Sequence, residues 1–346
     1  MALLFAVAGL LWWWSYPDKP GPPRAETVIV DIPKGTGVAG IAHVLTGAGV
    51  VEDDIRFVLL VKVLGASRRL KAGEYAFAPG MTPRAVLDLL TSGKVVQHAI
   101  TLPEGLTVAQ VAEVISDGGW GSREDFLRLA ADPGILARSG VEQITAEGYL
   151  FPDTYFIAKG TTLQTIITAM LRRMDLVLAE EGVGREIIRI ALPVSSPAPG
   201  EPAVAPSSLL FSRHEVLTLA SIIEKETALP DERPLVARVF LNRLRVGMKL
   251  QADPTVVYGL AKFGSPLTKG DLKTPNPYNT YVNRGLPIGP ICNPSRTAIA
   301  AVVRPSPEDY YYFVANGDGT HYFAKTLADH NRAVSRYRKK RLSNRE

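Results

Sequence analysis

The sequence predicts an α+β protein in which an apolar N-terminal segment precedes a small module and a larger mixed α/β domain. Three observations lead to this prediction. Apolar spacing changes repeatedly from every second residue to every third or fourth, glycine and proline stand at the changes, and the whole pattern occurs twice. A chain of 346 residues with 46% apolar and 21% charged residues is long enough for about two globular domains.

The first element is an uncharged apolar run, residues 1–14, read MALLFAVAGLLWWW. A helix that spans a bilayer needs about 20 apolar residues, so this run is short, but three consecutive tryptophans are typical of a membrane interface. No small-residue cleavage site follows it. We therefore interpret residues 1–14 as a retained, single-pass membrane anchor whose full length would need a start codon further upstream. The proline-rich residues 15–26 indicate a stiff, exposed linker.

The composition excludes several classes of site. Cys292 is the only cysteine, so neither an intrachain disulfide nor a cysteine-based zinc site is possible. The net charge of +5 is modest, and the only dense basic cluster is 336–341, which suits a solvated helix end. We expect no cofactor and no nucleic-acid partner.

Two segments, 30–45 and 100–115, share the pattern of a strand, a Pro-x-Gly turn and a helix. In each half, a second strand and helix follow further along, so both halves read β-α-(α)-β-α. We place the first module at residues 27–99 and the larger domain at 100–338, which begins with the second copy at 100–174. The first module resembles a LysM-type glycan-binding unit, a compact β-α-α-β fold, although a purely structural duplicate is an equally good interpretation.

Two further stretches stand out before the middle of the chain. EGYLFPDTY, residues 147–155, brings aromatic and acidic side chains around a turn, where Glu147 and Tyr149 would form either core or the floor of a sugar-binding groove. Residues 192–208 are rich in proline, alanine and serine, and they predict a flexible surface loop.

The next helix carries the strongest candidate for chemistry. Ser212 and Glu215 fit a capping box, and the helix then runs through ASIIEKET, residues 220–227. Glu224 and Glu226 both border the apolar face, so helical spacing does not choose between them. A carboxyl group at such a place either forms an ion pair or acquires a raised pKa that suits a general acid.

Polar side chains in glycine- and proline-rich loops follow this helix, and hydroxyls, amides and aromatic rings are the groups that bind sugars. The candidates for orienting the acid or the substrate are Asn242, Gln251, Asp253, Tyr278, Asn279 and Tyr281. Each of them would alternatively be an ordinary turn or packing residue.

Several long motifs now occur in a fixed order: EGYLFPDTY, ASIIEKET, LQADPTVVYG, YNTY, GLPIGPICNP and GTHYF. Together they resemble the YceG-like family of endolytic murein transglycosylases over nearly the whole chain. The resemblance implies that the first Glu of the E-K-E triplet, Glu224, is the single catalytic acid/base. It also implies cleavage of the MurNAc–GlcNAc β-1,4 bond of nascent glycan strands without water, leaving 1,6-anhydro ends.

The same resemblance implies a setting. The catalytic domain would lie on the periplasmic or outer face of a bacterial inner membrane, with peptidoglycan strands as substrate and peptidoglycan synthases as partners. A cut near nascent strands would terminate their elongation.

Other interpretations remain open at this point. A membrane-anchored peptidoglycan-binding protein without activity would keep the module and the aromatic loops, with Glu224 as a structural ion pair. A metal-dependent hydrolase finds little support, because none of the histidines is spaced as a metal motif: His43, His98, His214, His321 and His330. A serine hydrolase lacks its G-x-S-x-G motif.

Overall fold

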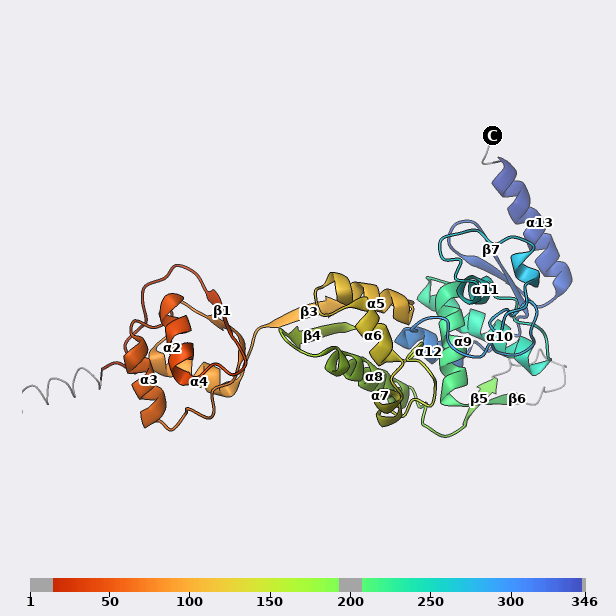
Figure 1. The fold of residues 1–346 in the computed structure, drawn as a ribbon. Helices are drawn as coiled ribbons and strands as arrows, with labels where there is room; N and C mark the ends of the chain where they lie inside the picture. Colours follow the sequence, from red (N-terminus) through yellow and green to blue (C-terminus); the bar gives the residue numbers. More distant parts are fainter. Residues whose placement is uncertain (1–14, 193–206, 344–346) are drawn as a thin grey trace, which may run out of the picture. The chain divides into compact units, whose positions relative to one another are not determined.

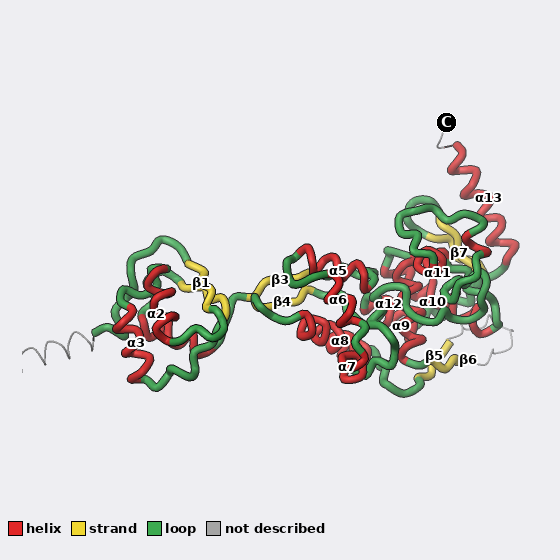
Figure 2. The backbone as a smooth tube through the Cα atoms, viewed as in Figure 1, coloured by secondary structure: helices red, strands yellow, loops and turns green. Residues whose placement is uncertain are grey.

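A computed structural model describes residues 15–192 and 207–343 of the chain (Figure 1). The chain divides into two compact units. The first extends through Ile100 and includes Tyr155–Thr161, and the second comprises Thr101–Thr154 and the chain from Thr162 onward. Helices predominate in both units, and the strands are short and paired in twos (Figure 2).

The first unit has the order β1 (Val28–Ile32), α2 (Val38–Gly47), α3 (Asp54–Val63), β2 (Gly73–Phe77) and α4 (Pro83–Ser92). Strands β1 and β2 are antiparallel, with Val28 opposite Phe77 and Ile32 opposite Gly73. Their inward side chains pack on the helices, so that Phe57, Tyr75 and Phe77 are fully buried. This compact core explains how about 70 residues hold together without a disulfide, since the burial of each large apolar side chain contributes about 1.5–3 kcal/mol.

Residues 15–26, predicted to be a stiff, exposed linker, are largely exposed but pack partly against the first unit. The side chain of Tyr16 is 2% exposed within the core of the first unit, and its hydroxyl donates to the backbone oxygen of Asp53 at 3.1 Å. The backbone nitrogen of Gly21 donates to the oxygen of Met81 at 3.1 Å. The segment is therefore part of the first unit. The buried aromatic ring of Tyr16 fixes it there.

The same order of elements then returns: β3 (Gln97–Thr101), α5 (Val108–Asp117), α6 (Arg123–Ala130), α7 (Pro133–Arg138), β4 (Thr154–Ala158) and α8 (Leu163–Glu180). Helix α5 begins as α2 does, after a Pro-x-Gly turn whose glycine has positive φ, Gly35 at 85° and Gly105 at 73°. The predicted repeat of β-α-α-β-α is confirmed, with the short helix α7 as an addition in the second copy.

The remainder of the second unit begins with an antiparallel hairpin of β5 (Ile188–Leu192) and β6 (Ser207–Phe211). The predicted flexible loop 192–208 falls between these strands, and its residues 193–206 lie outside the described part of the chain. The later elements are α9 (Arg213–Glu226), η1 (Pro230–Glu232), α10 (Arg233–Arg245), α11 (Asp253–Gly259), η2 (Asp271–Lys273), α12 (Arg296–Val303), β7 (Tyr312–Ala315), β8 (His321–Ala324) and α13 (Leu327–Ser343).

Helix α9 is the centre of this unit. Its predicted capping box is present, with the Ser212 hydroxyl accepting from the Glu215 nitrogen and the Glu215 carboxylate accepting from the Ser212 nitrogen. Every residue from Val216 to Ile223 is buried, because α10 and α12 pack against α9. A helix that is buried all round holds its last turn rigidly, and that turn carries the two acids.

None of the helices within residues 15–192 and 207–343 is long and apolar enough to cross a bilayer. The predicted anchor, residues 1–14, lies outside the described residues.

Candidate active site

A cavity of about 370 Å³ opens at the C-terminal end of α9. Glu226 from α9, Arg243 from α10 and Asp253 at the start of α11 line it. The rest of its lining comes from the loops and from the β7–β8 hairpin and α13: Gln251, Tyr281, Phe313, Val314, Ala315, His321 and His330. Segments far apart in the sequence therefore bring polar and ionisable groups together around one carboxyl group.

Glu226 has the surroundings of a proton donor. Burial raises its pKa to about 8, repulsion by the Asp253 carboxylate adds to the rise, and Arg243 opposes it. Among residues 15–192 and 207–343, no group donates a hydrogen bond to the Glu226 carboxyl. Glu226 is therefore mostly protonated at neutral pH and free to give its proton to a ligand in the cavity.

Arg243 does not neutralise this acid, because its guanidinium is held elsewhere. Its Nε donates to the backbone oxygen of Tyr311 at 2.8 Å and its Nη1 to that of Leu250 at 2.5 Å. The group lies 5.7 Å from the centre of the Tyr312 ring. These contacts fix a positive charge at the edge of the cavity without an ion pair to Glu226.

The opposite side of the cavity is built by a second acid and a tyrosine. The Tyr281 hydroxyl donates to Asp253 Oδ1 at 2.5 Å, which orients that carboxylate. Gln251, two residues before Asp253, has φ of 51°, a strained conformation for a residue with a side chain, and its nitrogen donates to the oxygen of Thr280. Such strain is typical of functional loops.

His321 and His330 also reach this cavity, as the sequence allowed. The Nδ1 of His321 lies 2.6 Å from Glu232 Oε2, and the backbone nitrogen of His321 donates to Glu232 Oε1 at 2.8 Å. This pairing holds the hairpin of β7 and β8 against η1. No group of three side chains with the arrangement of a metal site occurs within residues 15–192 and 207–343.

Glu224 lies in different surroundings from those expected of a catalytic acid. Its Oε1 accepts from Arg233 Nη2 at 2.7 Å, and its Oε2 accepts from both the nitrogen and the hydroxyl of Ser295, the N-cap of α12. The side chains of Glu224 and Arg233 are 6% and 5% exposed. Both oxygens are thus occupied in a buried junction of α9, α10 and α12. Glu226, and not Glu224, therefore lines the cavity, and the catalytic role that the sequence predicted for Glu224 stays a prediction.

A second pocket, of about 380 Å³, contains two of the other predicted residues, Glu147 and Tyr278, together with Thr107, Tyr258 and Phe263. A third, of about 240 Å³, shares Thr107, Tyr258 and Phe263 with the second and Asp253 with the Glu226 cavity. The third cavity therefore borders residues of both of the others.

Three predicted binding residues are structural instead. Asn242 is fully buried and donates to Asp309 Oδ1 and to the Tyr310 oxygen. Asn279 is 1% exposed and donates to the backbone oxygen of Thr274 at 2.8 Å. Tyr149 is 5% exposed, with its hydroxyl 3.0 Å from His214 Nδ1. These side chains shape the loops around the cavities without lining them.

Residues that sequence reasoning missed complete the cavities: Arg243, Tyr258, Phe263, Phe313 and His330. For Tyr258 a signal was present, since it belongs to the quoted motif LQADPTVVYG. The aromatic and histidine residues of the other elements reach the site only through tertiary packing, which no local pattern encodes.

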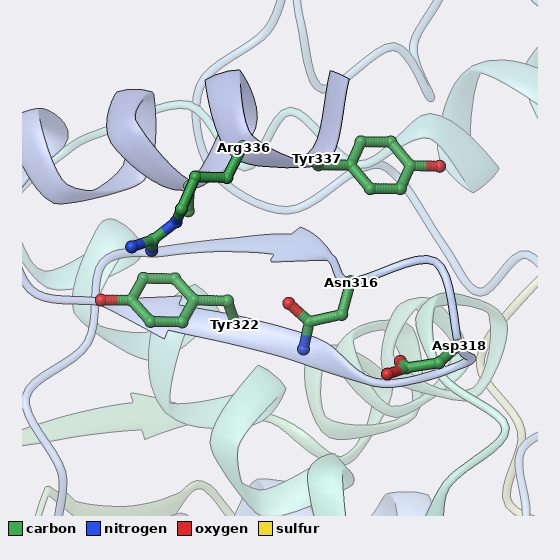
Figure 3. Close-up of a pocket in the computed structure, with 6 residues that line it drawn as sticks. Asn316, Asp318, Tyr322, Arg336 and Tyr337 are labelled. Atoms are coloured by element: carbon green, nitrogen blue, oxygen red, sulfur yellow. The ribbon is translucent and has the colours of Figure 1, made fainter. Parts of the chain in front are cut away.

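A separate cavity of about 240 Å³ lies between the turn that joins β7 to β8 and helix α13 (Figure 3). The Arg336 guanidinium lies 5.4 Å from the centre of the Tyr322 ring, and Asn316, Asp318 and Tyr337 complete the lining. None of these residues lines the Glu226 cavity, so we do not include them in the site.

Comparison with known proteins agrees with this architecture. A model of the YceG-like family matches residues 30–336. The endolytic murein transglycosylase of Bacillus subtilis (strain 168) is 34% identical over 327 residues, which are 90% of this chain and 85% of the relative. That of Streptococcus pneumoniae serotype 2 (strain D39) is 30% identical over 348 residues, and the match covers 91% of this chain and 59% of the relative.

A solved structure is also similar. A YceG-like protein from Listeria monocytogenes, known from a 2.6 Å crystal structure, is 32% identical, and the match has a TM-score of 0.54 and covers 89% of this chain and 99% of the other. Because the family model spans most of the sequence and two relatives reach 30% identity, the chain belongs to the YceG-like family.

Proposed function

We propose that this protein is an endolytic murein transglycosylase, a lyase that cuts peptidoglycan glycan strands with Glu226 as its single acid/base. The observation that carries the proposal is the place of Glu226 in a cavity beside Asp253, whose carboxylate the Tyr281 hydroxyl orients, with burial raising the pKa of Glu226 to about 8. The names of the relatives from B. subtilis and S. pneumoniae support the same reaction class.

In the first half of the reaction, Glu226 donates its proton to the oxygen that links N-acetylmuramic acid to the next sugar. The bond from the anomeric carbon to that oxygen breaks, and the leaving strand departs with a new hydroxyl. Positive charge develops on the ring as this bond lengthens. The Asp253 carboxylate, held by the Tyr281 hydroxyl, faces the same cavity and stabilises that charge.

In the second half, the carboxylate of Glu226 takes the proton of the 6-hydroxyl of the same N-acetylmuramic acid. The 6-oxygen then bonds to the anomeric carbon and closes a 1,6-anhydro ring. No water enters the balance, and the proton that left Glu226 returns to it. One carboxyl group with a pKa of about 8 suits both steps, because it is an effective acid before cleavage and an effective base after it.

The test is mass spectrometry of uncrosslinked glycan strands after digestion by three proteins: the wild type, Glu226→Gln and Glu224→Gln. We expect 1,6-anhydro ends with the wild type and none with Glu226→Gln, whose thermal unfolding should show an intact fold. Reducing ends in place of anhydro ends would indicate a hydrolase.

The Glu224→Gln arm decides between the two acids. If folded Glu224→Gln protein forms no anhydro ends while Glu226→Gln still does, the assignment to Glu226 is wrong. If neither the wild type nor any variant cuts the strands, the binding-protein alternative is favoured.

We also propose the setting of the reaction. The apolar residues 1–14, with their three tryptophans, would anchor the protein in a bacterial inner membrane, and both units would lie on the outer side with peptidoglycan synthases nearby. The β-α-α-β-α first unit would hold the glycan as a LysM-like module does. Fractionation of cells that express the full chain, followed by protease treatment of spheroplasts, tests the anchor and its orientation. Pull-down with insoluble peptidoglycan tests the first unit.

A further inference from the structure

The second pocket of the second unit has a chemistry that the cleavage mechanism does not use. Its walls are mainly aromatic: the Tyr258 and Phe263 rings are 6.4 Å apart between centres and nearly perpendicular, and the Tyr258 and Tyr278 rings are 4.8 Å apart. Glu147 carries the only carboxyl group among the pocket's lining residues. One carboxyl group and three aromatic rings thus line the same cavity.

Part of the role of Glu147 is structural. The Val108 nitrogen, the first of α5, donates to both of its oxygens at 3.1 and 3.2 Å, and the Tyr258 hydroxyl donates to Oε2 at 3.1 Å. These contacts cap the start of α5 and fix the carboxyl's position. They supply no positive charge, however, and no Lys, Arg or His within residues 15–192 and 207–343 forms an ion pair with Glu147.

The charge balance around Glu147 is therefore incomplete. Burial raises its pKa to about 7, against the three hydrogen bonds that lower it. The titratable groups that face it are Tyr258, Tyr278 and Cys292, and each of them has a raised pKa of its own. All three are neutral near pH 7. Lys225, which lines the neighbouring third cavity, donates to the Gly105 oxygen at 3.3 Å, so within residues 15–192 and 207–343 no cation pairs with this carboxylate.

We propose that the pocket of Glu147, Tyr258, Phe263 and Tyr278 binds a primary ammonium group carried by the glycan strand. A carboxylate beside aromatic faces is the arrangement that receives cations, since each ring adds its own attraction to the ion pair. An ammonium ion also has three donors for the carboxylate oxygens, and its carbon chain suits the aromatic walls.

The proposal deepens the proposed function, on which it rests. The third cavity, of about 240 Å³, shares Asp253 with the Glu226 cavity and shares Tyr258 and Phe263 with the pocket of Glu147, and we place one bound strand across these neighbouring sites. Two parts of such a strand carry a primary amine: the side chain of a diamino acid in a stem peptide, and a glucosamine that has lost its acetyl group. A crosslinked stem has an amide in place of this amine, so the pocket would distinguish uncrosslinked stems from crosslinked ones.

The test measures strand binding by calorimetry with the full chain in detergent. All proteins carry Glu226→Gln, which prevents cleavage and removes the other acid that titrates nearby. The probes are uncrosslinked strands with free stem amines and the same strands after acetylation of their amines. We expect acetylation to weaken binding about tenfold, and we expect the additional Glu147→Gln substitution to abolish that difference. Glu142→Gln, a substitution of an exposed acid in the same segment, should preserve it.

A second variant tests the pocket without disturbing the fold. Phe263 is 51% exposed, so Phe263→Ala should unfold at nearly the wild-type temperature while it lowers the preference for free amines several-fold. A third probe, with acetylated stems and deacetylated glucosamine, identifies the source of the amine. Binding of this probe as tight as that of the free-stem strand would show that the pocket also accepts an amine on the sugar, and weak binding would restrict it to the peptide.

The pH dependence gives a separate outcome. Ammonium binding needs ionised Glu147, so affinity for the free-amine strand should rise between about pH 6 and 8. Affinity that falls over this range would mean that protonated Glu147 donates a hydrogen bond to a neutral group, and the proposal would be overturned. Equal binding of free and acetylated strands would overturn it as well. Either result would leave intact the cleavage chemistry, whose own failure would be the absence of anhydro ends with the wild type.

Discussion

Glu224 and Glu226 are two residues apart on one helix, and the structure gives them opposite surroundings. Glu224 faces α10 and α12, where Arg233 and Ser295 hold both of its oxygens. Glu226 faces a cavity, where burial and Asp253 favour its protonated form. At about 100° per residue, a step of two turns the side chain by about 200°. The comparison teaches that the role of an acid in a helix depends on which neighbour it faces, more than on its sequence context.

The largest expected effect concerns activity. Removal of the cavity acid by Glu226→Gln should lower the rate of anhydro-end formation by at least about 10²–10⁴-fold, because proton transfer to the leaving oxygen is lost. Release of soluble muropeptides, quantified by chromatography, measures it. Residual activity within tenfold of the wild type would contradict the role of Glu226.

The second effect is a loss of folding stability when Glu224 is replaced. Glu224→Ala should lower the free energy of unfolding by about 3–5 kcal/mol, because it leaves the buried Arg233 without its partner. Urea denaturation measures this loss. The double variant Glu224→Leu with Arg233→Met should recover much of it, since no charge then remains buried. A Glu224→Ala protein as stable as the wild type would refute the structural role.

The third effect is the pH dependence of the reaction. Cleavage should decline as pH rises through about 8, because Glu226 then loses the proton that it must donate. Initial rates at constant ionic strength between pH 5 and 10 measure it. A decline centred near pH 4–5 would indicate an ordinary, solvent-exposed carboxyl group instead.

The same shift predicts a dependence of stability on pH. The pKa of Glu226 is raised in the folded state, so its contribution to stability is complete below about pH 4.5 and is lost as pH rises through about 8. Glu226→Gln cannot ionise, so its melting temperature should exceed that of the wild type at pH 9 and not at pH 4. Thermal scans of the two proteins at both values provide the comparison, and an equal difference at both would oppose it.

The smallest expected effect is the contribution of Asp253 to the raised pKa of Glu226. Asp253→Asn removes one of the two causes of the raised pKa, so the alkaline decline in rate should move to lower pH, by about half a pH unit. The rate at its optimum should also fall, since the developing positive charge loses a stabilising carboxylate. An unchanged pH profile would mean that burial alone raises the pKa of Glu226.

Much of the fold follows from the sequence because its signals are local. The repeat of strand, turn and helix depends on apolar spacing and on the glycines after the two prolines, and both copies are present. The capping box of α9 depends on Ser212 and Glu215 alone, and it is present too. Such features need no information about distant parts of the chain.

The surroundings of each residue in the site depend on distant parts of the chain, which local sequence patterns do not encode. The partners of Glu224 come from α10 and from the N-cap of α12, which is 71 positions away in the chain. Asn242 and Asn279 look like sugar ligands by residue type, yet their amides bind backbone oxygens of neighbouring segments. Composition likewise suggested a stiff, exposed linker at residues 15–26, because proline content does not reveal that the ring of Tyr16 is buried in the first unit.

The burial of Tyr16 sets the reach of the first unit. The proposed anchor ends at residue 14, and Tyr16 is already fixed in the core with its hydroxyl bonded to Asp53. Two residues of extended chain span only about 7 Å. If residues 1–14 sit in a bilayer, the first unit therefore stays at the membrane surface. If it also binds glycan as proposed, it would bind strands close to the membrane, where they emerge, and not deeper in the wall.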